Sequence, residues 1–261
     1  MVAAALKITY FSPRRSPEVN CLKMKNITGS TFIMYLIVTA TDFEIAPLRS
    51  ALAGVKAVAF LVTGMGLVET TLKLTRYLAA PSGPGRRPDL QGVINFGVAG
   101  AFTGSGLELG DFCLARQEIL GDLGICGNGE IKSFDVERLP VKTEFCLNNQ
   151  LSATAEAVLR QQAIAYRTGR FVTVNCASGT RARGEYLRDR YAAICENMEG
   201  AAVARVCEEY GLPCLALRCI SNWVEDRDPA RWRLAAACEE GGRKTALLVA
   251  GLLASGPKTG A

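Results

Sequence analysis

The segment VINFGVAG, residues 93–100, joins an apolar run to two closely spaced glycines. A continuous run rich in Val and Ile is typical of a strand that is covered on both faces of a sheet. Glycine lets the chain leave such a strand sharply, because it adopts backbone angles that other residues avoid. We therefore expect a buried strand over residues 92–97 and a glycine-rich turn at residues 97–100.

Similar apolar runs alternate with helix-like segments along the rest of the chain. Further strands are expected at residues 34–40, 57–63, 111–118, 170–176, 192–196 and 213–220. Helices are expected at residues 43–53, 66–80, 144–162, 181–190, 199–210 and 229–253. This alternation favours an α/β fold, a three-layer sandwich in which helices cover both faces of a central mixed, largely parallel sheet.

The two ends of the chain differ from this pattern. Residues 1–33 are polar over much of their length and show no clear periodicity, so we expect a disordered extension or a mis-assigned start before Met34. Residues 34–255 are expected to form a single domain, and residues 256–261 a short tail.

Composition excludes several classes of chemistry. The chain contains no histidine, which rules out Ser-His-Asp and Cys-His catalysis and most zinc sites. Its ten cysteines include no C-x-x-C pair, and Cys195, Cys207, Cys214 and Cys219 lie in apolar runs. Reduced cysteines packed in the core are the simplest interpretation. We expect neither a metal nor a cofactor.

Charge and hydropathy limit the partners of the protein. The net charge of +5 is spread along the chain without basic clusters, so no nucleic-acid partner is expected. No apolar run reaches the ~18 residues that a membrane span needs. The first residues lack the pattern of a signal peptide, and we expect a cytoplasmic protein.

Chemically active side chains follow several of the expected strands, where ligands bind in α/β sheets. Glu44 lies one turn into the first helix, either as an exposed first-turn acid or as a general base. Arg218 lies inside an apolar run, where it needs a carboxylate, either structural or functional. Glu199 begins a helix, where it either balances the helix dipole or accepts hydrogen bonds from two ribose hydroxyls.

Three motifs together resemble the nucleoside phosphorylase and nucleosidase superfamily. They are VINFGVAG at residues 93–100, ENMEGAAVA at residues 196–204 and ALRCISN at residues 216–222. The resemblance runs from about residue 35 to residue 253. It implies a nucleoside phosphorylase-like domain, a small-molecule nucleoside substrate, and a homodimer or larger homo-oligomer.

Two further motifs resemble the futalosine hydrolases within that superfamily. They are VTATDFE at residues 38–44 and SNWVEDRD at residues 221–228, with Trp232 beyond them. The methylthioadenosine nucleosidases share the Met-Glu helix entry but have Asp where this chain has Asn222. The resemblance implies hydrolysis of futalosine to hypoxanthine and dehypoxanthine futalosine, a step of menaquinone biosynthesis.

The resemblance also implies a role for each candidate residue. Glu44 would position and deprotonate the attacking water with help from Arg218, and Glu199 would bind the ribose hydroxyls. Substrate contacts would come from the backbone of Val98, Ala99 and Gly100, from Met198 against the sugar, from Ser221 and Asn222 at the purine edge, and from Trp223 and Arg227 at the carboxylated side arm.

Asn222 bears most directly on the substrate. An amide offers both an acceptor and donors, so it can accept from a protonated N7 and donate to a 6-oxo group. This favours hypoxanthine over adenine as the leaving base. A methylthioadenosine or aminodeoxyfutalosine nucleosidase, a purine nucleoside phosphorylase that uses Arg218 for phosphate, and a non-catalytic purine-binding module remain alternatives.

Overall fold

The computed structural model describes residues 34–80, 90–127, 130–134, 138 and 141–255. The expected extension at residues 1–33 and the tail at residues 256–261 lie outside this range, and the domain boundaries stay a prediction. The strands are β1 (Met34–Thr39), β2 (Val58–Val62), β3 (Leu90–Phe102), β4 (Phe112–Leu120), β5 (Ile125–Gly127), β6 (Glu130–Lys132), β7 (Glu144–Cys146), β8 (Arg167–Thr173), β9 (Ala193–Asn197) and β10 (Cys214–Val224). The helices are α1 (Asp42–Ala51), α2 (Leu67–Ala79), α3 (Gln150–Gln161), α4 (Arg181–Tyr191), α5 (Gly200–Glu209), the 3₁₀-helix η2 (Pro229–Arg231) and α6 (Leu234–Ser255).

The main sheet is mixed, as expected, but it also closes on itself. Its strands follow the order β10-β4-β8-β9-β3-β1-β2, and β10 pairs with β3 as well as with β4. Five strands therefore form a barrel-like ring, from which β1 and β2 extend. The α/β class and the mixed sheet were predicted, whereas the ring closure was not, because the pattern of single strands carries no information about it.

Strand β3 holds the ring together, and it is longer than the sequence suggested. Its first half pairs with β1, while Gly100 and Ala101 pair with β9, and β10 follows its other edge to residue 102. The turn expected at residues 97–100 is therefore wrong, and this segment continues the strand. A register shift between Ile220 and Asn222 of β10 accompanies the bend of the pair.

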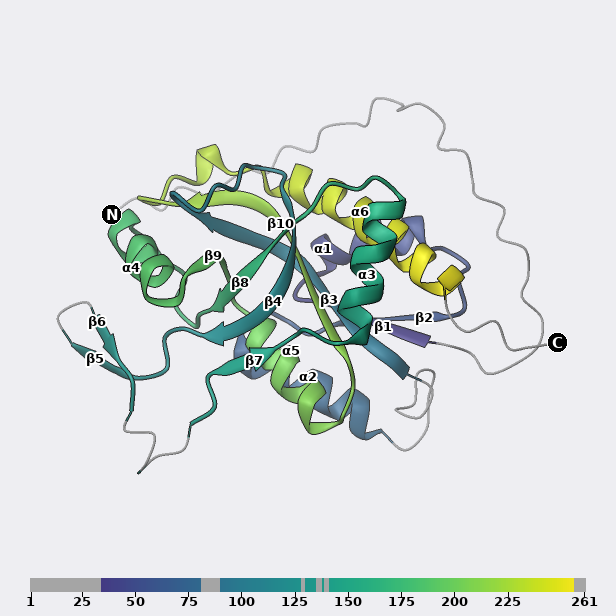
Figure 1. The fold of residues 1–261 in the computed structure, drawn as a ribbon, viewed down its shortest axis with the longest axis horizontal. Helices are drawn as coiled ribbons and strands as arrows, with labels where there is room; N and C mark the ends of the chain where they lie inside the picture. The colour runs from purple at the N-terminus through teal and green to yellow at the C-terminus, as the bar shows by residue number, and fades with distance from the viewer. Residues whose placement is uncertain (1–33, 81–89, 128–129, 135–137, 139–140, 256–261) are drawn as a thin grey trace, which may run out of the picture. The chain divides into compact units, whose positions relative to one another are not determined.

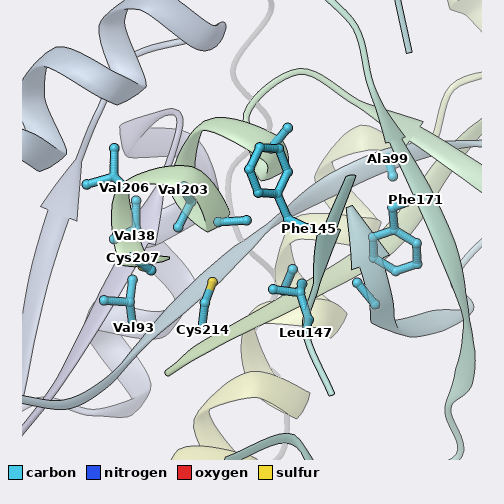
Figure 2. Close-up of a cluster of buried hydrophobic side chains, with 14 of the residues drawn as sticks. Val38, Val93, Ala99, Phe145, Leu147, Phe171, Val203, Val206, Cys207 and Cys214 are labelled. Carbon is cyan, nitrogen blue, oxygen red and sulfur yellow. The ribbon is translucent and has the colours of Figure 1, made fainter. Parts of the chain in front are cut away.

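Helices cover both faces of the sheet. Figure 1 shows α3 and α6 beside α1 on one side, and α2 beside α5 on the other. The two faces have separate apolar clusters. In Figure 2, Val203, Val206 and Cys207 of α5 pack in one of them with Val38 and Val93 of the sheet.

Three boundaries differ from the expected elements for local reasons. Residues 144–146 form β7 rather than the start of a helix, and Asn149 caps α3 by accepting from the Ser152 N–H at 3.0 Å. The helix expected from residue 229 begins at Leu234, because Asp228 and Pro229 open the short helix η2 instead. The small hairpin of β5 and β6 was not expected at all.

The described cysteines are free, and most of them are buried. Burial raises the pKa of the Cys195 thiol well above its usual value, and a hydrogen bond with Cys214 and burial do the same for Cys207. Reduced core cysteines are therefore confirmed for Cys195, Cys207, Cys214 and Cys219. Among the helices in the described ranges, none combines the length and the apolar character needed to cross a membrane.

Candidate active site

Glu44 is held at the start of α1 with one carboxylate oxygen facing the sheet. Thr41 caps the helix, and Glu44 Oε2 accepts from Thr41 N at 3.0 Å and from Thr41 Oγ1 at 2.8 Å. Glu44 Oε1 accepts from the Val98 N–H at 3.2 Å. The side chain is buried rather than exposed. It thus completes a capping box and also presents an oxygen to β3.

Arg218 is the largest fully buried side chain of the described residues, with 1% exposure. Its Nη1 donates to the carbonyls of Leu217 and Asn95 at 2.9 and 3.3 Å, and its Nη2 donates to Asn197 Oδ1 at 3.2 Å. Within the described part of the chain, no carboxylate lies within 4.0 Å of the guanidinium, and the buried Nε has no partner. Of the five N–H donors of the guanidinium, the Nε hydrogen and one Nη2 hydrogen therefore remain without a partner among the described residues.

Gly97 separates Glu44 from Arg218. A methyl group at this position would lie 2.9 Å from Glu44 Oε1 and 3.9 Å from Arg218 Cζ. Glycine therefore allows the carboxylate and the guanidinium to approach the same point of β3 from two elements.

Glu199 lies at the start of α5 and contacts a turn far away in the sequence. Its Oε1 accepts from the Gly66 N–H at 2.8 Å. Gly64 and Gly66 have φ angles of 86° and 87°, which glycine adopts more readily than other residues. Burial raises the pKa of the Glu199 carboxyl, and the Gly66 donor and then Arg218 oppose this rise.

Glu44, Arg218 and Glu199 form one electrostatic group, called the charged cluster below. Arg218 lowers the pKa of the Glu199 carboxyl, and the negative charge of Glu44 raises that pKa. Two carboxylates around one buried guanidinium can stabilise a developing cation and also take a proton from water. The arrangement brings together three residues that the sequence places on separate elements.

Asn222 lies on the same strand pair, nearer the end of β3. It pairs with Gly100, and a methyl group at Gly100 would lie 3.0 Å from its Nδ2. Ser221 Oγ donates to Asn222 Oδ1 at 2.8 Å, and Asn222 Nδ2 donates to the Trp223 carbonyl at 3.1 Å. Because a carbonyl can only accept, the atom facing Trp223 must be the nitrogen, and this fixes the orientation of the amide.

The backbone expected to line the sugar and base is partly used within the protein. The Val98 N–H binds Glu44, and the Ala99 carbonyl accepts from Ser221 Oγ at 3.3 Å. Met198 is half-buried between Asn197 and Glu199. Gly100 itself is buried, and Asn222 and Val224 cover it.

Of the two residues expected at a side arm, Trp223 lies near the end of β10 and Arg227 lies in the segment that follows. Arg227 is exposed, and its Cζ lies 4.6 Å above the centre of the Trp232 ring. Trp223 packs partly against the apolar cluster beneath the sheet. The aromatic neighbour of Arg227 is therefore Trp232, to which sequence analysis gave no binding role.

Sequence analysis also missed a buried polar layer. Glu118 accepts from Thr173 Oγ1 at 2.9 Å and from Asn197 Nδ2 at 3.1 Å, and Asn197 contacts Arg218. Glu196 accepts from the Ser178 N–H and Oγ at 2.9 and 2.7 Å. In β4, Glu118 follows the polar Arg116 and Gln117, so no local pattern of the sequence marks it as buried.

Comparison with known proteins gives consistent matches over this domain. The phosphorylase superfamily matches residues 40–254. Futalosine hydrolase from Thermus thermophilus is 30% identical over 208 residues, which cover 77% of this chain and 88% of that protein. A 5′-methylthioadenosine/S-adenosylhomocysteine nucleosidase from Geobacillus kaustophilus is 30% identical over 179 residues, covering 67% of this chain and 70% of that protein.

A solved structure has the same fold. It is that of a futalosine hydrolase mutant of Helicobacter pylori strain 26695, which superposes with a TM-score of 0.72. The alignment covers 84% of this chain and 99% of the other, at 23% identity.

Proposed function

The chain belongs to the phosphorylase superfamily, and from this premise we propose that it hydrolyses futalosine to hypoxanthine and dehypoxanthine futalosine. Its named relatives are nucleosidases and futalosine hydrolases, and the protein is an N-glycosyl hydrolase like them. The identity of the substrate is the proposal, and the observation that supports it is the orientation of the Asn222 amide.

The nucleophile in this proposal is water held by Glu44. The Glu44 carboxylate is fixed by three donors from Thr41 and Val98. Thr41 occupies both lone pairs of Oε2, whereas Oε1 keeps one lone pair for a further hydrogen bond. A water on Oε1 would lie near Gly97 and within the field of Arg218. As the C–N bond breaks, the base leaves with the bonding electron pair and takes a proton at N7 from solvent water. Glu44 accepts a proton from the attacking water while the oxygen of that water bonds to C1′ of the ribose.

Phosphate fits this position poorly. Arg218 donates both Nη1 hydrogens to carbonyls and one Nη2 hydrogen to Asn197, so only Nε and the second Nη2 hydrogen remain for an anion. Glu44 and Glu199 place two acidic groups beside it, and close like charges oppose the binding of an anion. The cluster therefore supports hydrolysis rather than phosphorolysis.

The ribose is assigned to Glu199. Its carboxylate is anchored through one oxygen to Gly66, and the ionised group can still accept from the 2′ and 3′ hydroxyls. These bonds hold C1′ between the water on Glu44 and the base on Asn222. Their strength in the transition state depends on Glu199 being ionised.

Asn222 selects the base. Ser221 uses one lone pair of Oδ1 and Trp223 uses one hydrogen of Nδ2, so one acceptor site and one donor remain side by side. A protonated purine N7 and a 6-oxo group complement this pair. An adenine base would place its 6-amino hydrogens against the remaining N–H, which disfavours adenosine-type substrates.

The second candidate is cleavage of methylthioadenosine or aminodeoxyfutalosine, which both release adenine. The Geobacillus nucleosidase, which has the same sequence identity to this chain as the futalosine hydrolase of Thermus, favours this second candidate.

A direct assay of base release distinguishes the two candidate functions. Purified protein is incubated without phosphate with futalosine, aminodeoxyfutalosine, methylthioadenosine or inosine, and the free base is quantified. We expect hypoxanthine from futalosine, whereas adenine release would reject the substrate assignment and a requirement for phosphate would reject hydrolysis.

The Asn222→Asp variant is expected to change the preferred base. A protonated carboxyl donates to N7 and lacks the N–H that opposes a 6-amino group, so adenine nucleosides should gain relative to futalosine. We expect the ratio of kcat/KM for aminodeoxyfutalosine to that for futalosine to rise about tenfold or more. An unchanged ratio would show that Asn222 does not contact the base.

As pH is lowered, activity is expected to fall at a higher pH than the pKa of an ordinary glutamate would predict. Burial raises the pKa of Glu199 above 4.5, so its ionised form is lost as pH falls through a value higher than 4.5. Ribose binding should weaken with it, and kcat/KM measured from pH 8 downward should reach half its plateau above pH 4.5. Melting temperatures at each pH separate this loss from unfolding. A flat profile down to pH 4.5 would contradict the assignment of Glu199.

A further inference from the structure

A buried carboxylate lies behind the charged cluster and is not used by the proposed chemistry. Glu118 of β4 has 0% exposure. Its oxygens accept from Thr173 Oγ1 at 2.9 Å and from Asn197 Nδ2 at 3.1 and 3.3 Å. Burial raises the pKa of Glu118, whereas Arg218 and then these two donors lower it. Because both neighbours donate, the site suits the ionised form.

The fold makes room for Glu118 at the start of α5. A methyl group at Gly200 would lie 1.9 Å from Glu118 Oε1, so only glycine allows the helix to approach this closely. The Ala201 N–H donates to Thr173 Oγ1 at 2.8 Å. Glu118 and Thr173 thus take the place of solvent at a helix N-terminus that is buried.

Asn197 connects Glu118 to the charged cluster. Its Nδ2 donates to Glu118, so its Oδ1 points the other way. There it accepts from Gly200 N at 2.7 Å, from Glu199 N at 3.0 Å and from Arg218 Nη2 at 3.2 Å. Rotating the amide by half a turn would place its NH₂ group against three donors. The bond to Glu118 therefore fixes an acceptor that two cluster residues share.

We propose that Glu118 is a positioning residue, which acts through Asn197 to hold the Arg218 guanidinium and the backbone of Glu199 in their reactive places. This inference rests on the proposed function of the charged cluster. In this arrangement Arg218 donates to the neutral amide of Asn197. The carboxylate that balances its charge belongs to Glu118, on the other side of that amide. Exchanging the amide and the carboxylate between positions 118 and 197 should then preserve the hydrogen-bond chain.

Three variants test this exchange. In Glu118→Gln the charge-assisted bonds become neutral ones of about half the strength, and kcat for base release should fall about tenfold. In Asn197→Asp two carboxylates face each other, and kcat should fall at least as far. In the double variant Glu118→Gln/Asn197→Asp the new carboxylate accepts from Arg218 and from the new amide, and kcat should return to within about threefold of the wild type.

The double variant is the decisive measurement, because a merely structural role predicts that two core changes add rather than cancel. Melting temperatures establish that each variant is folded. If Glu118→Gln fails to fold and the double variant folds, the activity of the double variant still tests the proposal. Wild-type kcat in Glu118→Gln would overturn the proposal. So would a folded double variant no more active than the worse single one.

Hydrogen exchange of the Gly200 amide gives a readout that needs no substrate. This N–H donates to Asn197 Oδ1, so its exchange should quicken in Glu118→Gln and return in the double variant. Unchanged exchange in Glu118→Gln would overturn the proposal. If the wild type cleaves none of the four nucleosides, the proposed function fails, while the exchange rates still decide the role of Glu118.

Discussion

Glu44→Gln is expected to lower kcat for hypoxanthine release by about 10²- to 10⁴-fold, the range found for general bases. An amide cannot take the proton of the attacking water. Its NH₂ group would also face one of the donors that now bind the carboxylate, from Thr41 or Val98. KM should change little, because Glu44 contacts the water rather than the nucleoside. Initial rates at saturating futalosine measure the effect.

Asp42→Asn is the matched control for this variant. Asp42 lies in the same first turn of α1, and its side chain is 83% exposed in a surface ion pair with Arg49. The control removes the same charge near the same helix end, and surface pairs contribute little, so kcat should stay within about twofold. If Glu44→Gln keeps more than about a tenth of wild-type kcat while folded, Glu44 is only a helix cap.

Glu199→Gln is expected to reduce kcat/KM by at least about 10²-fold. Hydrogen bonds to a charged group each contribute about 1.5–3 kcal/mol, and two ribose hydroxyls depend on this carboxylate. The amide keeps one acceptor oxygen, and Gly66 already occupies one of its two lone pairs. Steady-state kinetics across a range of futalosine concentrations should show both a higher KM and a lower kcat, since the ribose is held in both ground and transition states.

Glu209→Gln provides the comparison on the same helix. Glu209 pairs with Arg205 at 2.9 Å, and both side chains are more than half exposed. Its loss should leave kcat/KM within about twofold. A 2′-deoxy form of the substrate gives a second check: wild type should lose activity on it, whereas Glu199→Gln should lose much less. Equal losses in both proteins would remove Glu199 from the ribose site.

The elements with strong apolar periodicity could be predicted from the sequence, and the ring of strands could not. Residues 34–40 and 57–63 were expected as strands and form β1 and β2. The closure between β3 and β10 depends on how two long strands bend, which no local pattern encodes. In β7, Phe145 is buried between the exposed Glu144 and Cys146, an alternation too short to separate from the helix that follows.

The candidate site could be predicted in part, because its residues follow strands. Glu44, Arg218 and Glu199 were singled out as functional candidates, and the structure groups them around Gly97 and Gly66. Glu118 could not be found this way. Its partner Asn197 lies 79 residues away, and a glutamate in a strand usually indicates a solvent-facing position.

Strand β3 sets the distance between the parts of the site at which Glu44 and Asn222 are proposed to act. Gly97 lies beside the Glu44 carboxylate and Gly100 beside the Asn222 amide, and the three residue steps from one glycine to the other span roughly 10 Å at about 3.3 Å per residue. The extended backbone of β3 fixes the distance between these two glycines. In the proposed complex, a substitution at Asn222 would therefore alter contacts with the base and leave Gly97 in its place beside Glu44.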